Sequence, residues 1–408
     1  MSLNIPVKML DLRGQKVNKI THATETREVV ICCDRDRRRR ARDPITGEKA
    51  SINRYVRRRV RDVPFMGCRC LIDVELAQVT TPHNGKRMEA CDFVQKGARW
   101  THRFAMFVSG LCRHMSILAV SKHLGIRWET VKNIDTHYLL GHLPDMDPGR
   151  LSNIKYLGVD EVARSKGHDY MTVIYDMVSG HLVGVEVGRT AEVFSDFLKR
   201  LPVKTAENIE AVAMDMGPAY QKSVREYLPN ADIVFDRFHV MQNYSKALSN
   251  QRRIEFRKAD REGKELIKGT HYLLLKNAVN LSEDQEERLS RLLLVNTNFS
   301  LMYMLKEQLQ WLWETRTYQE MQDSLAIWCS IADRCNMIYI RKFAGFLRRH
   351  ADGICNYARH RLTSARIEAG NVSIGLIRKR ARGVRDTEYF KLKIRQTSIP
   401  DNISMFYY

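Results

Sequence analysis

The sequence lacks the features that would carry a protein to or through a membrane. No apolar run in its 408 residues approaches the roughly 18 that a membrane-spanning helix needs. The amino terminus, MSLNIPVKMLDLRGQK, has no apolar core of a secretory signal. Internal repeats and low-complexity segments are also absent. We therefore expect a globular cytoplasmic protein with no membrane partner, long enough for two or three domains.

Paired cysteines are the second absence. The nine cysteines are an odd number, and those near the amino terminus are adjacent (Cys32 and Cys33), separated by one residue (Cys68 and Cys70) or alone (Cys91). None of these spacings is the C-x2-4-C pair that holds zinc in structural sites. Without a secretory context, disulfides are not expected either. We predict reduced thiols and no structural zinc.

Acidic residues are scarce in two particular segments. The net charge is +20; residues 1–62 hold 17 Lys and Arg against 8 Asp and Glu, and residues 341–395 hold 15 against 4. These two segments account for the whole surplus. Solvated faces that keep the chain in solution would explain them, but Arg predominates and its planar guanidinium suits phosphate. We favour a nucleic-acid partner, and expect the chain to associate with the nucleoid.

Residues 1–100 are expected to form a small, strand-rich, basic module. Residues 17–33 and 68–80 alternate roughly with period two, as strands do. Between them lie RDRRRRARDP and RYVRRRVRD, too charged for a core, which we interpret as loops that contact phosphates rather than merely solvated ones. The candidate DNA contacts here are arginines: Arg37, Arg38, Arg39, Arg40, Arg57, Arg58 and Arg59.

Residues 101–145 change to helical periodicity and predict a helix-turn-helix. A short apolar-faced helix, Gly125 and a second helix from about Trp128 give that layout. The residues expected to pack the two helices together are Leu118, Ala119, Leu124, Val131 and Ile134. Because the second helix of such a motif enters the major groove, its candidate DNA contacts are Arg127, Glu129, Thr130, Lys132 and Asn133.

After an expected linker at 143–153, residues 152–239 alternate between strand and helix patterns. The order βββαβαβ predicts a mixed sheet of the ribonuclease H-like α/β fold. Residues 240–363 show only helical spacing, and we expect an all-helical insertion whose tryptophans at 311, 313 and 328 belong to its core. Residues 364–396 predict a final basic helix of the catalytic domain, and 397–408 a tail.

Two aspartates end strands that would lie side by side in such a sheet. Asp160 is expected at the end of the first strand and Asp215 at the end of the fourth. Neighbouring carboxylates repel each other, and a bound cation with oxygen ligands such as Mg²⁺ relieves that repulsion. Glu368, from the last helix, would complete a clamp for two Mg²⁺ or Mn²⁺ ions suited to phosphodiester chemistry. Each aspartate alone would pass for an ordinary loop residue. Glu161 should face the other way, and Asp176 is a nearby carboxylate of no assigned role.

Four separated motifs give a resemblance to a known family. GVDEVARSKGH, AMDMGPAYQKSV, FDRFHV and RIEAGNVSIGLIRKRARGVRD occur in this order with fitting spacing. They resemble the DDE transposases of bacterial insertion sequences, most closely the ISL3 family, over about residues 100–396. The resemblance implies a catalytic triad of Asp160, Asp215 and Glu368, accompanied by Asp236 and His239 after the fifth strand. The final helix then implies contacts to DNA ends from Asn371, Arg378, Lys379 and Arg380.

The chain departs from that family in two places. Members usually begin with a paired-cysteine zinc module, and we expect a metal-free version of it here. Where the family often has Glu-Gly, this chain has Glu368-Ala369-Gly370-Asn371, which retains a small residue. His239 is equally compatible with a structural hydrogen bond and with a direct role near the scissile phosphate.

The resulting hypothesis is an enzyme, a transposase that binds terminal inverted repeats and cleaves and transfers DNA strands with Mg²⁺ or Mn²⁺. Two DNA ends must meet, so at least a dimer is expected. A DNA-binding regulator without catalysis would need only residues 1–140 and leaves the spaced acids unexplained. A ribonuclease H-like nuclease that cuts without strand transfer is the other alternative.

Overall fold

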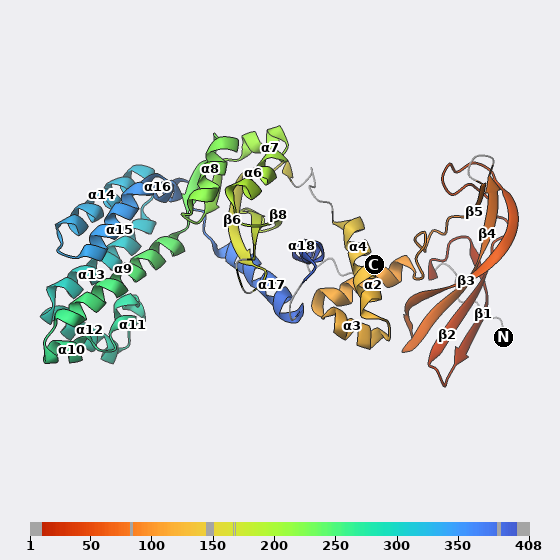
Figure 1. The fold of residues 1–408 in the computed structure, drawn as a ribbon, viewed down its shortest axis with the longest axis horizontal. Coiled ribbons are helices and arrows are strands. Elements are labelled where there is room, and N and C mark those ends of the chain that lie inside the picture. The colour runs from red at the N-terminus through yellow and green to blue at the C-terminus, as the bar shows by residue number, and fades with distance from the viewer. Residues whose placement is uncertain are drawn as a thin grey trace. The chain divides into compact units, whose positions relative to one another are not determined.

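The computed structural model describes residues 10–81, 85–143, 151–165, 167, 169–381 and 385–397. The described residues form two compact units, one up to Leu143 and one from Leu151 onward (Figure 1). Residues 144–150 of the expected linker at 143–153, and residues 398–408 of the expected tail at 397–408, lie outside these ranges. No helix within them is long and apolar enough to cross a membrane.

The first unit begins with a five-stranded sheet. Its strands are β1 (Gln15–Ala23), β2 (Glu28–Arg35), β3 (Ser51–Phe65), β4 (Cys68–Thr81) and β5 (Gly85–Met88), in the order β1-β2-β4-β3 with β5 also paired to β4. Alternate residues of β2 and β4 point into one core, which contains Ile31, Cys33, Cys70 and Ile72. Burial raises the pKa of the Cys33 and Cys70 thiols to about 12 each, so both behave as apolar core residues.

The arginine-rich stretch RYVRRRVRD is not a loop, as the sequence suggested, but the centre of β3. This strand pairs with β4 along one side, and its other side carries an isolated bridge from Arg61 to Trp100. An edge strand tolerates charge, because its side chains and one row of its backbone groups face water. Its alternation is visible only in Val60 and Asp62, which are buried between exposed or half-buried neighbours. In the other stretch, 35–44, residues 36–44 lie in turns and irregular backbone, as expected, but Arg35 ends β2 and is buried.

Three helices complete this unit: α2 (His102–His114), α3 (Ile117–Leu124) and α4 (Trp128–His142). Ser116 caps α3, and Gly125 ends it in the left-handed conformation with φ 62°. Leu124, Val131 and Ile134 are buried between the helices as expected. Leu118 is not; it is 58% exposed, and Val120, one-half turn further along α3, is fully buried in its place.

A buried carboxylate ties these helices to the sheet. Asp62 of β3 is 1% exposed. It accepts hydrogen bonds from Thr101 Oγ1 at 2.6 Å and Arg103 Nε at 2.7 Å, and Arg103 also donates to the carbonyl of Leu10 at 2.6 Å. The guanidinium of Arg61 reaches the Leu124 carbonyl at the end of α3, at 3.2 Å.

The second unit contains the mixed sheet that the sequence predicted. Its strands are β6 (Tyr156–Ala163), β7 (Tyr170–Asp176), β8 (Leu182–Val187), β9 (Ala211–Met214) and β10 (Asp232–Phe235), in the order β10-β9-β6-β7-β8. β6, β7 and β8 are antiparallel neighbours, whereas β9 pairs parallel to β6 and β10 parallel to β9. Strands one and four are therefore adjacent, as expected.

Helices cover both faces of this sheet (Figure 1). One face packs against α6 (Ala191–Lys199) and α8 (Pro218–Tyr227), with α7 (Val203–Asn208) between them in the chain. The other face packs against α17 (Ala365–Ala381) and α18 (Thr387–Gln396). The sequence suggested one final helix, but Asp386 caps a second. A side chain at Gly158 would overlap Ile367, so the glycine lets α17 cross β6 closely.

The all-helical block between β10 and α17 is confirmed. It comprises α9 (Arg237–Lys258), α10 (Arg261–Ile267), α11 (His271–Leu275), η1 (Ala278–Asn280), α12 (Glu283–Val295), α13 (Thr297–Trp311), η2 (Leu312–Glu314), α14 (Tyr318–Arg334), α15 (Ile338–Arg349) and α16 (Ala351–His360). Trp313 and Trp328 lie in its core, as predicted, but Trp311 is 70% exposed at the end of α13. The strand predicted at 231–240 ends at Phe235, because Asp236 caps α9.

Candidate active site

Asp160 and Asp215 lie on neighbouring parallel strands. The register pairs Gly158 with Ala213; continued by two residues, it puts Asp160 beside Asp215 on the same face of the sheet. Asp215 follows β9 directly, as expected. Asp160 lies within β6 rather than at its end, because β6 stays paired with β7 as far as Ala163. The two carboxylates therefore meet where β9 ends and β6 continues.

Hydrogen bonds hold both carboxylates. Asp160 Oδ1 accepts from the backbone N–H of Glu161 at 2.7 Å, and its Oδ2 accepts from Asn371 Nδ2 at 2.7 Å. Asp215 Oδ1 accepts from the backbone N–H of Gly217. Burial raises the pKa of Asp160, as does the charge of Asp215, while the two hydrogen bonds and the charge of His239 oppose this rise. Asp160 is thus a partly desolvated carboxylate beside the exposed carboxylate of Asp215.

The third acid lies on the other side of the site. Glu368, in the first turn of α17, accepts a hydrogen bond from Ser364 Oγ at 2.7 Å, and its charge acts on Asp236. Within the described ranges, no three His, Cys, Asp or Glu side chains come close enough to hold a metal ion. Glu368 nevertheless precedes Asn371 by three residues on one helix, so the two share a face. Asn371 contacts Asp160 from that face.

Asp236 and His239 occupy the first turn of α9. Asp236 is 8% exposed and caps the helix through Phe238 N at 3.2 Å. Burial raises the pKa of Asp236, and the nearby Glu368 adds to that effect. In the described part of the chain its Oδ2 has no hydrogen-bond partner, and His239 Nε2 lies 3.8 Å from it. Since the charge of His239 also acts on Asp160, this histidine lies between the two groups of acids.

The sequence did not identify Tyr175 as part of the site. Its hydroxyl donates a long hydrogen bond, 3.5 Å, to Asn371 Oδ1, and burial raises its pKa. A carboxylate only accepts hydrogen bonds, so the amide of Asn371 must present its nitrogen to Asp160 and its oxygen to Tyr175. A Cβ at position 370 would overlap the Tyr175 ring and hydroxyl, which explains the glycine before Asn371. Tyr175 reaches the site because it lies beside Gly158 in the sheet, where α17 crosses. Neither relation can be seen in a single sequence.

The remaining acids near the sheet have other partners. Glu161 points away from Asn371, as its place on the strand predicted, and lies 3.5 Å from Arg189. Asp176 accepts hydrogen bonds from the backbone N–H groups of Val178 and Ser179. It shapes the turn between β7 and β8.

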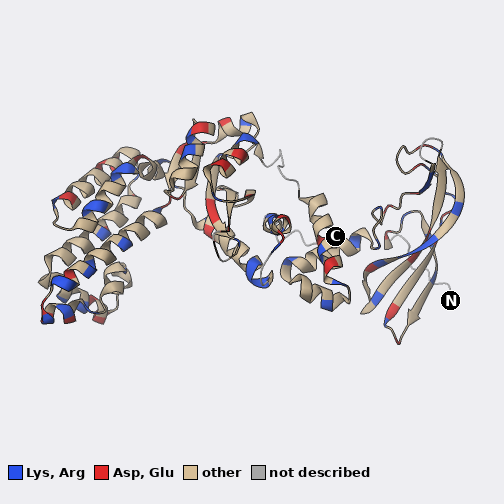
Figure 2. Cartoon of the chain, viewed as in Figure 1, with Lys and Arg blue, Asp and Glu red and all other residues tan. Residues whose placement is uncertain are grey.

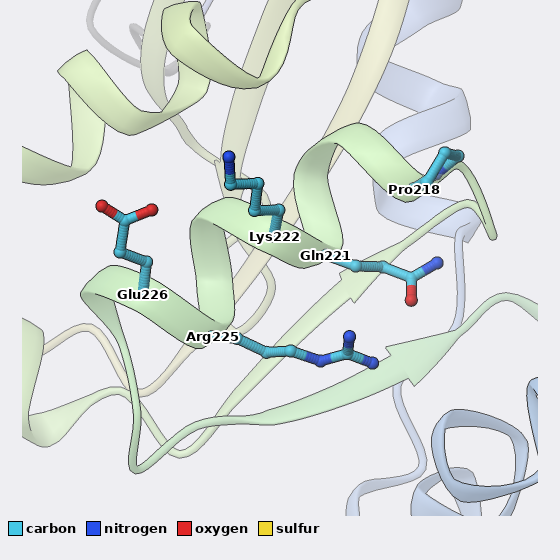
Figure 3. A pocket seen from close by; sticks show the side chains of 5 residues that line it. All are labelled: Pro218, Gln221, Lys222, Arg225 and Glu226. Carbon is cyan, nitrogen blue, oxygen red and sulfur yellow. The ribbon is translucent and has the colours of Figure 1, made fainter.

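A hollow of about 390 Å³ follows α8, the helix after Asp215 (Figure 3). Its lining residues all come from this helix: Pro218, Gln221, Lys222, Arg225 and Glu226. Gln221 donates to the carbonyls of Met216 and Gly217 at 3.0 and 3.2 Å. These bonds fix the short loop that carries Asp215.

The arginines proposed as DNA contacts in the first unit differ in how they are paired. Arg37 lies 2.7 Å from Glu75, and Arg39 lies 3.3 Å from Asp92. Arg57 lies between Asp34 and Asp73, at 2.9 and 3.4 Å, and Arg58 donates to the carbonyl of Ala98. The side chains of Arg38, Arg40 and Arg59 are exposed.

The other proposed DNA contacts lie on α4 and α17. Arg127, Glu129 and Asn133 are exposed near the start of α4, and Thr130 and Lys132 are half-buried. On α17, Lys379 and Arg380 are exposed, whereas Arg378 donates to the carbonyl of Ala163 at 2.6 Å. Asn371 faces Asp160, as described above. The structure thus divides the proposed DNA contacts among four separate elements: the turns after β2, strand β3, α4 and α17.

Comparisons with known proteins agree with these features. A family model described as a transposase, of the ISL3 group with a DDE domain, matches residues 157–394, and one described as the helix-turn-helix domain of transposase family ISL3 matches residues 89–139. The chain is 33% identical over 349 residues to the transposase for insertion sequence element IS1001 of Bordetella parapertussis, covering 85% of each. It is 27% identical over 340 residues to the transposase for IS1557 of Mycobacterium tuberculosis, covering 78% of this chain and 76% of that one.

Proposed function

Because the chain belongs to the ISL3 family of DDE transposases, we propose that it moves an insertion sequence by binding the terminal inverted repeats and then cutting and joining DNA strands. The observation that carries this proposal is the pair formed by Asp160 and Asp215 on adjacent parallel strands. A regulator without catalysis would have no use for a half-buried carboxylate, Asp160, held beside a second carboxylate, Asp215. Since desolvating a charge is costly, such a pair needs a compensating partner.

Two hard oxygen-donor carboxylates suit a divalent cation, and Mg²⁺ or Mn²⁺, as two ions, is the proposed cofactor. When bound, such ions polarise a phosphodiester and favour an attacking water or 3′ hydroxyl. Asp160 and Asp215 would hold them, with Glu368 as the third ligand once its carboxylate leaves Ser364. Asn371 and the backbone of Glu161 orient Asp160, and Asp236 and His239 lie beside the site as accessory groups.

The division of labour along the chain follows the sequence prediction. Residues 1–100 would be a metal-free, basic DNA-binding module and 101–145 a helix-turn-helix in which α4 enters the major groove. Residues 152–239 and 364–396 would form a ribonuclease H-like catalytic domain around the helical insertion at 240–363. The strand order with an adjacent first and fourth strand supports that fold. We place the protein in the bacterial cytoplasm, on the nucleoid, and expect at least a dimer when two ends are synapsed.

A cleavage assay tests this function. The purified protein is incubated with a labelled duplex that spans an element boundary, with Mg²⁺, Mn²⁺ or EDTA. We expect cleavage at the boundary only with metal, and a loss of about 10²- to 10³-fold in Asp160→Asn or Asp215→Asn, as when preorganised electrostatic groups are removed. Glu161→Gln, one residue from Asp160 but facing Arg189, should retain activity.

Three other outcomes would change the conclusion. Normal cleavage by Asp160→Asn would refute the proposed site. Specific binding with no cleavage under any metal would favour the DNA-binding regulator. Cleavage without joining to a target duplex would favour the nuclease.

A further inference from the structure

One face of α9 carries a continuous row of basic and amide side chains. Within this 22-residue helix, polar residues recur at intervals of four, three, four, three and four. That spacing keeps side chains on a single helical face. The row, which we call the α9 track, consists of His239, Asn243, Lys246, Asn250, Arg253 and Arg257.

Burial divides the helix accordingly. Val240, Tyr244, Leu248 and Gln251 are buried against the helical block, on the side opposite to the track. Lys246, Arg253 and Arg257 are exposed, and the other three members are half-buried. In Figure 2, Lys and Arg positions recur along the ribbons of this helical block. The track is thus a solvent-facing surface rather than part of a core.

Beyond His239, which lies 3.8 Å from Asp236, the lysine and one arginine of the track contact neutral groups. Lys246 contacts the side-chain oxygen of Gln242, and Arg253 that of Asn250, each at 3.4 Å. The helix has a single carboxylate, Glu255, which is buried and accepts hydrogen bonds from Gln251 at 2.8 Å and Asn298 at 3.0 Å. A face of Lys, Arg and amide groups without a carboxylate of its own has the composition of a surface for phosphates.

The track starts at the candidate active site. His239 lies in the first turn of α9, 3.8 Å from Asp236, and the backbone N–H of Asp236 donates to the carbonyl of Met214, the residue before Asp215. From His239 to Arg257 the helix rises about 27 Å at 1.5 Å per residue. Duplex DNA of about eight base pairs spans that length at 3.4 Å per pair. A duplex whose scissile phosphate lies at Asp160 and Asp215 therefore has a complementary surface to follow away from the site.

We propose that the α9 track binds the phosphodiester backbone of the duplex that adjoins the scissile phosphate. The proposal rests on the function proposed above and adds a DNA contact on the helical block, outside the amino-terminal unit and α17. Its contacts are to phosphates, so they position the DNA without reading its sequence. The helical block then serves as a support for the substrate as well as a spacer between β10 and α17.

The test measures DNA binding in EDTA, so that no cleavage is needed. Full-length protein in which Lys246, Arg253 and Arg257 are all changed to Gln is titrated with an element-boundary duplex across a range of salt concentrations. Three lost phosphate contacts reduce the slope of log affinity against log salt by about 2.7, and weaken binding at 0.15 M salt by at least about tenfold. Phosphate-ethylation interference should disappear over about eight base pairs on one side of the cut.

Two further variants keep the result interpretable. Arg261, Lys264 and Arg334 are exposed basic residues of the same block outside α9; changing all three to Gln removes the same charge and should leave the interference pattern intact. The charge-conserving triple variant, Lys246→Arg with Arg253→Lys and Arg257→Lys, should restore the slope. Equal effects of the two neutralised triples, or no change in slope, would overturn the proposal. Because binding is measured without metal or cleavage, a failure of the catalytic assignment would leave this measurement unaffected.

Discussion

The two acidic pairs of the candidate site are held in opposite ways. Asp160 and Asp215 each accept hydrogen bonds from the backbone just beyond them, and Asn371 adds a third donor. Glu368 instead accepts a hydrogen bond from the side chain of Ser364, the residue before α17, and Asp236 accepts one from the backbone N–H of Phe238. The two acids of the second pair are thus each held by a donor outside the sheet. The proposed triad requires Glu368 to leave Ser364, whereas the strands already bring Asp160 and Asp215 together.

Among changes to the groups that hold the acids in place, the largest effect is expected from Asn371→Ala, which removes the side-chain donor to Asp160. Loss of such an orienting group costs about 10- to 100-fold in metal affinity or activity. We expect that decrease in cleavage rate and in Mn²⁺ affinity measured by calorimetry, with unchanged binding of element ends. Val372→Ala, an exposed neighbour, is the control. If DNA binding fell while Mn²⁺ affinity stayed normal, Asn371 would be a contact to DNA, as the sequence first suggested.

Gly370→Ala should displace α17, which carries both Asn371 and Glu368, and so affect both acidic pairs. The new methyl group overlaps the hydroxyl of Tyr175, and overpacking of this kind costs about 1–3 kcal/mol of folding stability. Thermal unfolding should show the lower midpoint. In the double variant with Tyr175→Ala the overlap is gone, so Gly370→Ala should cause no further loss of stability beyond that of Tyr175→Ala alone. If the two losses of stability add, the methyl group is strained against a residue other than Tyr175.

The smallest effect is expected from Ser364→Ala, which frees Glu368 from its local partner. A single neutral donor to a charged acceptor is worth about 1.5–3 kcal/mol at most, and the exposed position of Glu368 reduces this further. The Mn²⁺ concentration for half-maximal cleavage should fall a few-fold. Ser373→Ala, whose hydroxyl contacts only the Ala369 carbonyl on the same helix, should not change it. A higher Mn²⁺ requirement in Ser364→Ala would show that this serine helps the site.

Much of the second unit was predictable, because its sequence patterns are local or follow from the alternation of side chains along a strand. Strand order and the side-chain period of two bring Asp160 and Asp215 together. The helical block is predicted by the helical spacing of its apolar residues. The position of the Glu368 carboxylate was not predictable, since a rotamer and one contact with Ser364 decide it. Tyr175 escaped notice for a related reason, as its approach to Asn371 depends on how α17 crosses the sheet.

In the first unit, the high density of arginines concealed a strand in the sequence. The arginines of β3 hid a 15-residue strand, because a sequence gives no sign of which strand lies at an edge. The number of arginines in the first unit also overstates how many are available to bind phosphate, because Arg37, Arg39 and Arg57 have carboxylate partners. Similarly, Leu118 and Trp311 are apolar residues at helical spacing that nonetheless face solvent. Apolar spacing identifies a helix more reliably than it identifies the side that is covered.

The contact of Asp62 with Thr101 and Arg103 bears on how the recognition of element ends could be re-engineered. A chimaera that exchanged only the three helices α2 to α4 between relatives would separate a nearly inaccessible carboxylate in β3 from the cation that neutralises it. Breaking a buried pair on one side costs about 3–5 kcal/mol, a large share of the stability of a domain of this size. The end recognition that we propose for this unit would therefore be transferred with the sheet and the helices together, from residue 10 to residue 143.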